Sequence, residues 1–172
     1  TGESLEKLLN FFLQRHKQQL IAAGAADADA YDAAAVNFSY FISQREKAAA
    51  LTAAKKSDSF KSIAQSFKRI NNILKKSGHT DVSVNPEYFE HAEEKDLYNA
   101  LLSLRSEIEG FVTAGKWNEA TASLNGFAAP LEAFFDKVMV MAEDEKVRNN
   151  RLSLLASLRE LFVTVGDLGE II

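Results

Sequence analysis

The spacing of apolar residues constrains the fold of this 172-residue chain more than any other feature. Apolar residues recur every three or four positions along most of the sequence, which is typical of helices with one buried face. Only two prolines and eight glycines occur, and we find no two-residue alternation of the kind that indicates a strand. The sequence therefore predicts an all-α fold: one helical bundle of about seven to eight helices, with residues 1–172 as a single domain.

Capping residues, glycines and prolines set the expected boundaries of these helices. The expected order is a helix that ends near Gly24, a short helix after Asp27 or Asp29, one from about Asn37 to Ala54, one that begins at Asp58 or Ser59, a long helix to about Thr113, a short one from Trp117 to about Phe127, one that opens at Pro130, and a last one from about Asp144 to Val165. The longest irregular segment is expected between residues 77 and 87.

A cation lies in the middle of the apolar face of the last expected helix. On a helical wheel of about 100° per residue, Arg151 falls among the leucines of that face. A buried cation needs a paired carboxylate, and the nearest upstream acid in an otherwise apolar run is Asp136. We predict a structural ion pair between Asp136 and Arg151. The apolar residues around Asp136 are expected in the core: Phe134, Phe135, Val138, Met139 and Met141.

The charge of the chain is uneven. Its net charge is −4, yet residues 55–76 hold seven Lys or Arg residues against the single acid Asp58. On the wheel, one side of the expected helix carries what we call the basic ridge: Lys61, Lys68, Arg69, Asn72, Lys75 and Lys76. Lys and Arg attract phosphates and an Asn can read a base edge, so the ridge favours RNA binding. The alternative is an ordinary solvated helix face.

Three sequence runs resemble a known family. They are FFDKVMVM at residues 134–141, RNNRLSLL at 148–155 and KRINNIL at 68–74, with a weaker similarity at 45–50. Together they resemble the last domain of the β subunit of bacterial glycyl-tRNA synthetase, a helical anticodon-binding module related to that of arginyl-tRNA synthetase, a class I enzyme. The chain departs from this pattern before Pro130, where Ala128 and Ala129 stand in place of a common Arg-Glu pair.

The resemblance implies a non-catalytic part of a larger β subunit that recognises the anticodon arm of glycine tRNA. It implies that the whole enzyme is a cytoplasmic glycine–tRNA ligase that uses ATP and Mg, with glycine activated on the α subunit and no cofactor in this part. The implied partners are glycine tRNA, the rest of the β subunit and the α subunit, with no membrane and no DNA. The candidate tRNA-binding residues are Lys61, Lys68, Arg69, Asn72, Lys75, Arg45 and Arg148.

Two of these candidates have a structural alternative. Arg45 could instead pair with a carboxylate inside the bundle. Arg148 lies at the edge of the last apolar face, where it could either reach outward to a phosphate or have a structural role.

The sequence shows no catalytic constellation. There is no cysteine, and the three histidines have no metal-ligand spacing. Phosphate-binding glycine loops and nucleophile motifs are missing as well. The rival reading is a helical protein–protein interaction bundle without an RNA role; the related domain of arginyl-tRNA synthetase fits the three runs less well.

Overall fold

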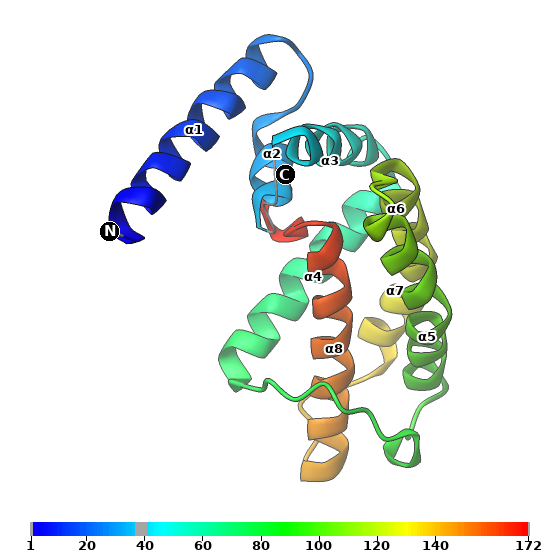
Figure 1. The fold of residues 1–172 in the computed structure, drawn as a ribbon. Helices are drawn as coiled ribbons and strands as arrows, with labels where there is room; N and C mark the ends of the chain where they lie inside the picture. The colour runs from blue at the N-terminus through cyan, green and yellow to red at the C-terminus, as the bar shows by residue number, and fades with distance from the viewer. Residues whose placement is uncertain (1, 37–40, 172) are drawn as a thin grey trace.

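The computed structural model describes residues 2–36 and 41–171, and within these ranges it contains eight α-helices, three short 3₁₀ turns and no strand (Figure 1). The helices are α1 (Gly2–Ala22), α2 (Ala28–Ala35), α3 (Phe41–Ala54), α4 (Asp58–Ser77), α5 (Ala92–Thr113), α6 (Trp117–Ser123), α7 (Ala128–Lys137) and α8 (Glu145–Val165); the turns are η1 (Pro86–Tyr88), η2 (Leu124–Phe127) and η3 (Leu168–Glu170). The all-α prediction is confirmed. The expected start of the third helix at Asn37 lies outside the described residues.

Local capping chemistry explains several of these boundaries. The hydroxyl of Ser57, rather than Asp58 or Ser59, caps α4 by accepting the N–H of Phe60 at 3.2 Å. Gly78 ends α4 with a φ of 66°, a left-handed conformation that glycine adopts readily. Helix α8 begins beside Asp144 as expected, and the carboxylate of Asp144 caps it by accepting the N–H of Val147 at 3.0 Å.

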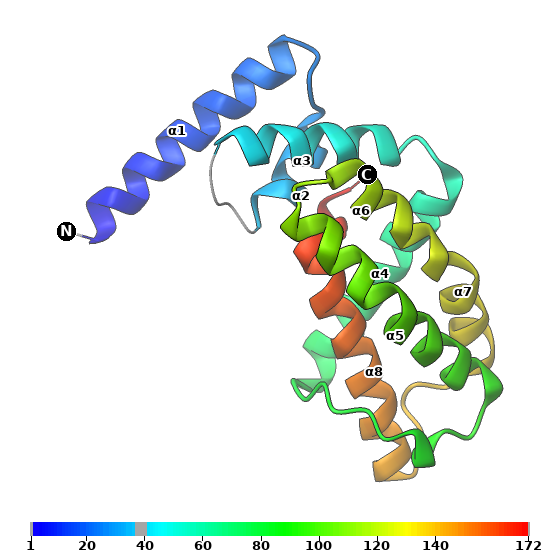
Figure 2. The same cartoon turned by 45° about the vertical axis from the view of Figure 1, so that its right-hand side comes forward.

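Helix α8 is the central element of the bundle. It packs against α4 and α5, and residues 150–158 are buried without exception. Figures 1 and 2 show α4, α5, α7 and α8 side by side in the body, α2 and α3 at one end, and α1 extending away from it. Because residues 150–158 are all buried, the polar side chains in this stretch need partners.

Arg151 finds that partner on α5. Its side chain is 3% exposed; Nε donates to Glu94 Oε1 at 2.9 Å, and Nη2 donates to Glu94 Oε2 at 3.1 Å and to Glu90 Oε2 at 2.9 Å. Nη1 donates to the carbonyl of Met139 at 3.0 Å. Glu94 is fully buried, and its carboxylate also accepts the backbone N–H groups of Glu90 and His91. The cluster thus joins α8, the start of α5 and the chain before α8.

The predicted partner of Arg151 is wrong. Asp136 is exposed on α7, and the acid that pairs with Arg151 is Glu94, 57 positions away in the sequence. Packing of α5 against α8 creates this contact, and no local pattern reveals which acid a distant helix will supply. The buried ion pair itself was correctly expected; only its acid was misassigned.

The residues after α7 also depart from the expectation. Residues 138–144 are not helical: Val138 and Val140 are buried, whereas Met139 and Met141 are 74% and 55% exposed. Buried valines alternate with exposed methionines because neighbouring side chains point to opposite sides of an extended backbone. The core assignment of the two methionines was therefore wrong, because it assumed that the helix continued.

Burial raises the pKa of Glu94, but hydrogen bonds from Arg151 and from the backbone N–H groups of His91 and Glu90 outweigh it, so the pKa of Glu94 lies below its ordinary value. Glu94 is therefore ionised in the folded protein at neutral pH, which keeps the pair with Arg151 charged.

A second buried cation, Lys47 on α3, has a different environment. It is 2% exposed, and its Nζ lies 5.1 Å from the centroid of the Trp117 ring on α6. Among the described residues, none of the ion pairs involves Lys47. Burial lowers the pKa of Lys47 from 10.5 to about 8. A difference of that size corresponds to roughly 3 kcal/mol of cost for the charged form in the folded state.

Replacing Arg151 by Ala should lower the free energy of unfolding by about 3–5 kcal/mol, because it leaves the Glu94 carboxylate buried and uncompensated. Asp136→Ala, at an exposed position, should change it by less than about 0.5 kcal/mol. Urea unfolding at pH 7 measures both. The losses from Arg151→Ala and Glu94→Ala should not add in the double variant; additive losses, or a large effect at Asp136, would contradict the assignment.

Lys47→Met should stabilise the protein by about 1–3 kcal/mol at pH 7 and by much less at pH 10.5. Below pH 8 Lys47 is protonated in both states, so the folded wild type bears the full cost of burial. Between pH 8 and 10.5 the unfolded state binds more protons, so wild-type stability rises and the advantage of the variant shrinks. Denaturant unfolding of both proteins at the two pH values tests this, and an equal advantage at both would refute it.

Candidate nucleic-acid interface

The basic ridge lies on the outer face of α4. The opposite face of this helix packs into the core through Phe60, Ile63, Phe67, Ile70 and Leu74. Lys61, Arg69, Asn72, Lys75 and Lys76 are exposed, and Lys68 is half-buried. The structure thus brings the predicted ridge residues together on one exposed face.

Several ridge side chains also hold neighbouring elements. Lys61 pairs with Asp58 at 3.1 Å, and Lys68 Nζ donates to the carbonyl of Ile171 at 2.8 Å. The guanidinium carbon of Arg69 lies 4.2 Å from the centroid of the Phe135 ring on α7. A substitution at Lys68 or Arg69 would therefore disturb packing as well as charge.

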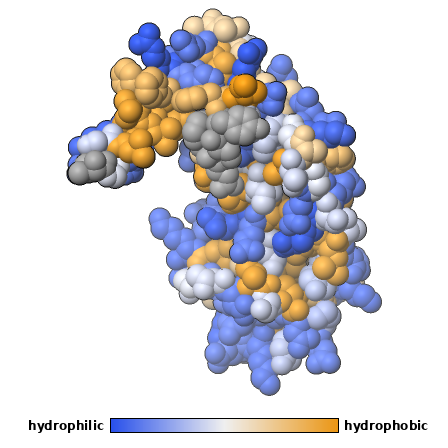
Figure 3. Space-filling model, in the orientation of Figure 1, coloured by the Kyte–Doolittle hydropathy of each residue, from blue (hydrophilic) through white to orange (hydrophobic). Residues whose placement is uncertain are grey.

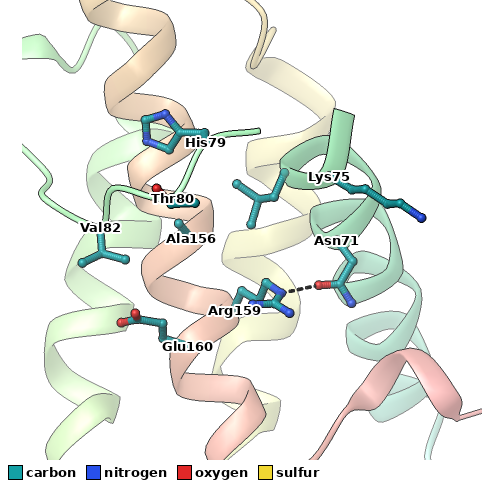
Figure 4. Close-up of a pocket in the computed structure, with 9 residues that line it drawn as sticks. Asn71, Lys75, His79, Thr80, Val82, Ala156, Arg159 and Glu160 are labelled. Atoms are coloured by element: carbon teal, nitrogen blue, oxygen red, sulfur yellow. Dashed lines mark hydrogen bonds between the residues drawn. The ribbon is translucent and has the colours of Figure 1, made fainter. Parts of the chain in front are cut away.

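A groove with a volume of about 430 Å³ opens beside the ridge, between α4, α8 and the chain that follows α4 (Figure 4). Its lining residues are Asn71, Leu74, Lys75, His79, Thr80, Val82, Ala156, Arg159 and Glu160. Leu74 and Ala156 are buried and form an apolar floor, whereas Lys75 and Arg159 are exposed at the rim. Arg159 Nε donates to Asn71 Oδ1 at 2.7 Å, so the amide holds the guanidinium in place.

One wall of the groove belongs to an extended segment, residues 79–85, which we call the strap. Three buried polar residues of α8 hold it. Ser153 Oγ is hydrogen-bonded to His79 Nε2 at 2.9 Å, and Ser157 Oγ donates to the carbonyl of Val82 at 2.8 Å. Asn150 Oδ1 accepts the N–H of Asn85 at 2.7 Å. These bonds fix the wall, so the groove is preformed.

The two other candidate arginines lie elsewhere. Arg148 Nη1 donates to the carbonyls of Ala142 and Glu143 at 2.9 and 3.1 Å, and so fastens the turn that enters α8. Arg45 is exposed on α3; burial and then the charge of Arg45 lower the pKa of His16 on α1. Arg45 therefore lies beside α1, and the structure does not join it to the ridge.

Sequence reasoning missed Arg159 and the groove. Arg159 stands at the border of the apolar face of α8, a signal that a wheel can display, but its link to Asn71 joins residues 88 positions apart. In the part of the chain that the structure describes, no group of three or more His, Asp or Glu side chains could hold a metal ion. No helix within these ranges is long and apolar enough to cross a membrane.

Comparison with known proteins finds one matching family model and several similar proteins. A family model described as "DALR anticodon binding domain" matches residues 63–168. The chain is 36% identical over 169 residues to the glycine–tRNA ligase beta subunit of Geotalea daltonii, which covers 98% of this chain and 24% of that protein. The glycine–tRNA ligase beta subunit of Pectobacterium carotovorum is 45% identical over 112 residues, which is 64% of this chain and 16% of that protein. The beta subunit of Desulfatibacillum aliphaticivorans is 33% identical over 174 residues, which is 99% of this chain and 25% of that protein.

The chain thus spans about a quarter of the length of the relatives that align over nearly all of it. The matched family region contains most of the basic ridge, the groove and all of α8. With more than half of its residues inside that model, the chain belongs to the DALR anticodon-binding domain family.

Proposed function

We propose that this chain is the tRNA-binding module of a glycine–tRNA ligase β subunit and that it binds the anticodon arm of glycine tRNA. The observation that carries the proposal is the basic ridge on the outer face of α4, beside a preformed groove, in a chain whose net charge is −4. The family match and the beta-subunit relatives support it. They favour it over an adaptor bundle without an RNA role.

The ridge and the groove suit different parts of an RNA loop. Lys61, Lys75 and Lys76 offer charge to the phosphates, a contact that depends little on sequence. The groove offers an apolar floor and a guanidinium held by Asn71, which suits one unstacked base. The ridge would then supply most of the affinity, and the groove would supply base selectivity.

In the whole enzyme this binding would act on catalysis from a distance. Contacts with the correct anticodon arm would orient the acceptor end of the tRNA at an active site elsewhere and so convert remote binding energy into positioning. ATP, Mg and glycine would be handled by the α subunit, in the cytoplasm. The module itself would contribute no catalytic residue.

Lys61→Glu combined with Lys75→Glu should weaken binding of a glycine anticodon stem–loop at least tenfold at physiological salt, because it reverses two charges that face phosphate. These residues are better suited than Lys68 and Arg69, which contact Ile171 and Phe135. Fluorescence anisotropy over a salt series measures the affinity and its salt slope.

The matched control carries the same charge change away from the ridge, Lys7→Glu with Lys116→Glu, at two exposed positions. The affinity of this control for the stem–loop should fall by no more than about threefold, since only longer-range charge is altered. Unchanged affinity of a folded Lys61/Lys75 variant, or an equal loss in the control, would contradict RNA binding through the ridge.

Arg159→Gln should reduce discrimination between the glycine stem–loop and one with replaced anticodon bases, at a cost of about 1–3 kcal/mol for the correct RNA. Glutamine keeps a polar group near Asn71 but removes the guanidinium. Lys75→Gln, which removes one charge at the rim of the groove, should instead weaken binding of both RNAs to the same extent. If the two variants behave identically, the groove does not read a base.

A further inference from the structure

Helix α1 carries an apolar stripe that is covered at only one end. On the wheel, Leu5, Leu8, Leu9 and Phe12 continue the side that also holds His16 and Leu20. Leu20 is 7% exposed, and His16 contacts Tyr31 on α2, with Nδ1 3.1 Å from the Tyr31 hydroxyl. The other four residues are 69%, 51%, 39% and 47% exposed in the order given.

Contacts at its covered end fix the direction of α1. Lys17 pairs with Asp32 at 2.6 Å, and the Tyr31 hydroxyl donates to the carbonyl of Leu13 at 3.1 Å. The His16 and Phe41 rings also meet, with centroids 5.0 Å apart. The free half of α1 therefore projects from the bundle, as Figures 1 and 2 show.

Other large apolar side chains in the N-terminal part of the chain are exposed as well. Val36 and Ile42, which flank the α2–α3 connection, are 45% and 68% exposed, and Phe11 on α1 is 59% exposed. Figure 3 shows apolar side chains gathered on α1, on the side that faces the hollow between this helix and the bundle. Apolar patches beyond about 300–600 Å² are unusual on monomers and mark interaction sites.

The relatives indicate what covers this surface. The anticodon-binding family model begins at Ile63, so α1, α2 and α3 lie outside it. Yet beta subunits of Geotalea daltonii and Desulfatibacillum aliphaticivorans align with 98% and 99% of this chain, which is 24% and 25% of their own length. Helix α1 is thus shared with proteins that have about three times as much additional chain, and the basic ridge and the groove that we assign to RNA lie on other helices.

We propose that the apolar face of α1 docks against an apolar surface in the rest of the same β subunit and so sets the position of the tRNA-binding module. An interface between domains of one chain typically buries 600–1,500 Å², and tethering raises the effective concentration of the partner surface. A tethered partner surface can therefore cover this face without a second molecule. The occupant is apolar, because the face carries no charge between Leu5 and Phe12 on its stripe.

Amide hydrogen exchange of the intact β subunit and of this chain alone tests the proposal. Amides of α1 between residues 5 and 12 should exchange at least tenfold more slowly in the intact subunit, while those in the centre of α8 should exchange equally in both. Leu8→Glu with Phe12→Glu should abolish the difference. Asn10→Glu with Gln14→Glu, which places the same charges on the exposed polar side of α1, should preserve it.

Equal exchange of α1 in the two wild-type proteins would overturn the proposal. So would protection that already appears in the isolated chain and rises with its concentration, since that result identifies a second copy as the occupant. The α1 variants should leave stem–loop binding by the isolated chain unchanged, so this test fails or succeeds independently of the RNA-binding function.

Discussion

The buried cluster around Arg151 is the interaction on which the rest of the bundle depends. One guanidinium donates to Glu94 and Glu90 on or beside α5 and to the carbonyl of Met139, while α8 carries it through the middle of the core. An uncompensated charge at such a site costs several kcal/mol. Separating the three segments would leave this charge without partners, so the cluster favours the observed crossing of α5 and α8.

Helix α8 serves both the core and the candidate RNA surface. Its leucines pack inward, while Asn150, Ser153 and Ser157 hold the strap through hydrogen bonds to Asn85, His79 and Val82. Buried polar groups require partners, and here the partner is the wall of the groove. The polar residues that interrupt the apolar sequence of α8 thus explain why the groove beside the ridge is preformed.

The molecule separates two kinds of surface. The basic ridge and the groove lie on α4 and α8 and suit a charged, single-stranded loop, whereas the exposed face of α1 is apolar. In an acidic chain, one basic face concentrates the attraction for RNA and orients its approach. The apolar face would then decide where that bound loop stands relative to the rest of the subunit.

Much of the fold follows from local patterns in the sequence. Periodicity and capping residues predicted the helices, and the ridge was placed correctly on the outer face of α4 because an amphipathic helix buries its apolar side. The position of Arg151 required a buried carboxylate, since a core cation must be paired. These inferences succeed because they depend on residues within a few turns of one another.

Only the tertiary structure decided which distant groups meet. Glu94 rather than Asp136 pairs with Arg151, and Asn71 orients Arg159, across separations of 57 and 88 residues. Met139 and Met141 are exposed because the chain is no longer helical after α7. In the sequence, the apolar stripe of α1 resembles a stripe that faces a core; the structure shows that the bundle leaves most of it exposed. Local sequence determines which face of a helix is apolar and which charges need a partner; the partner itself depends on how remote helices pack.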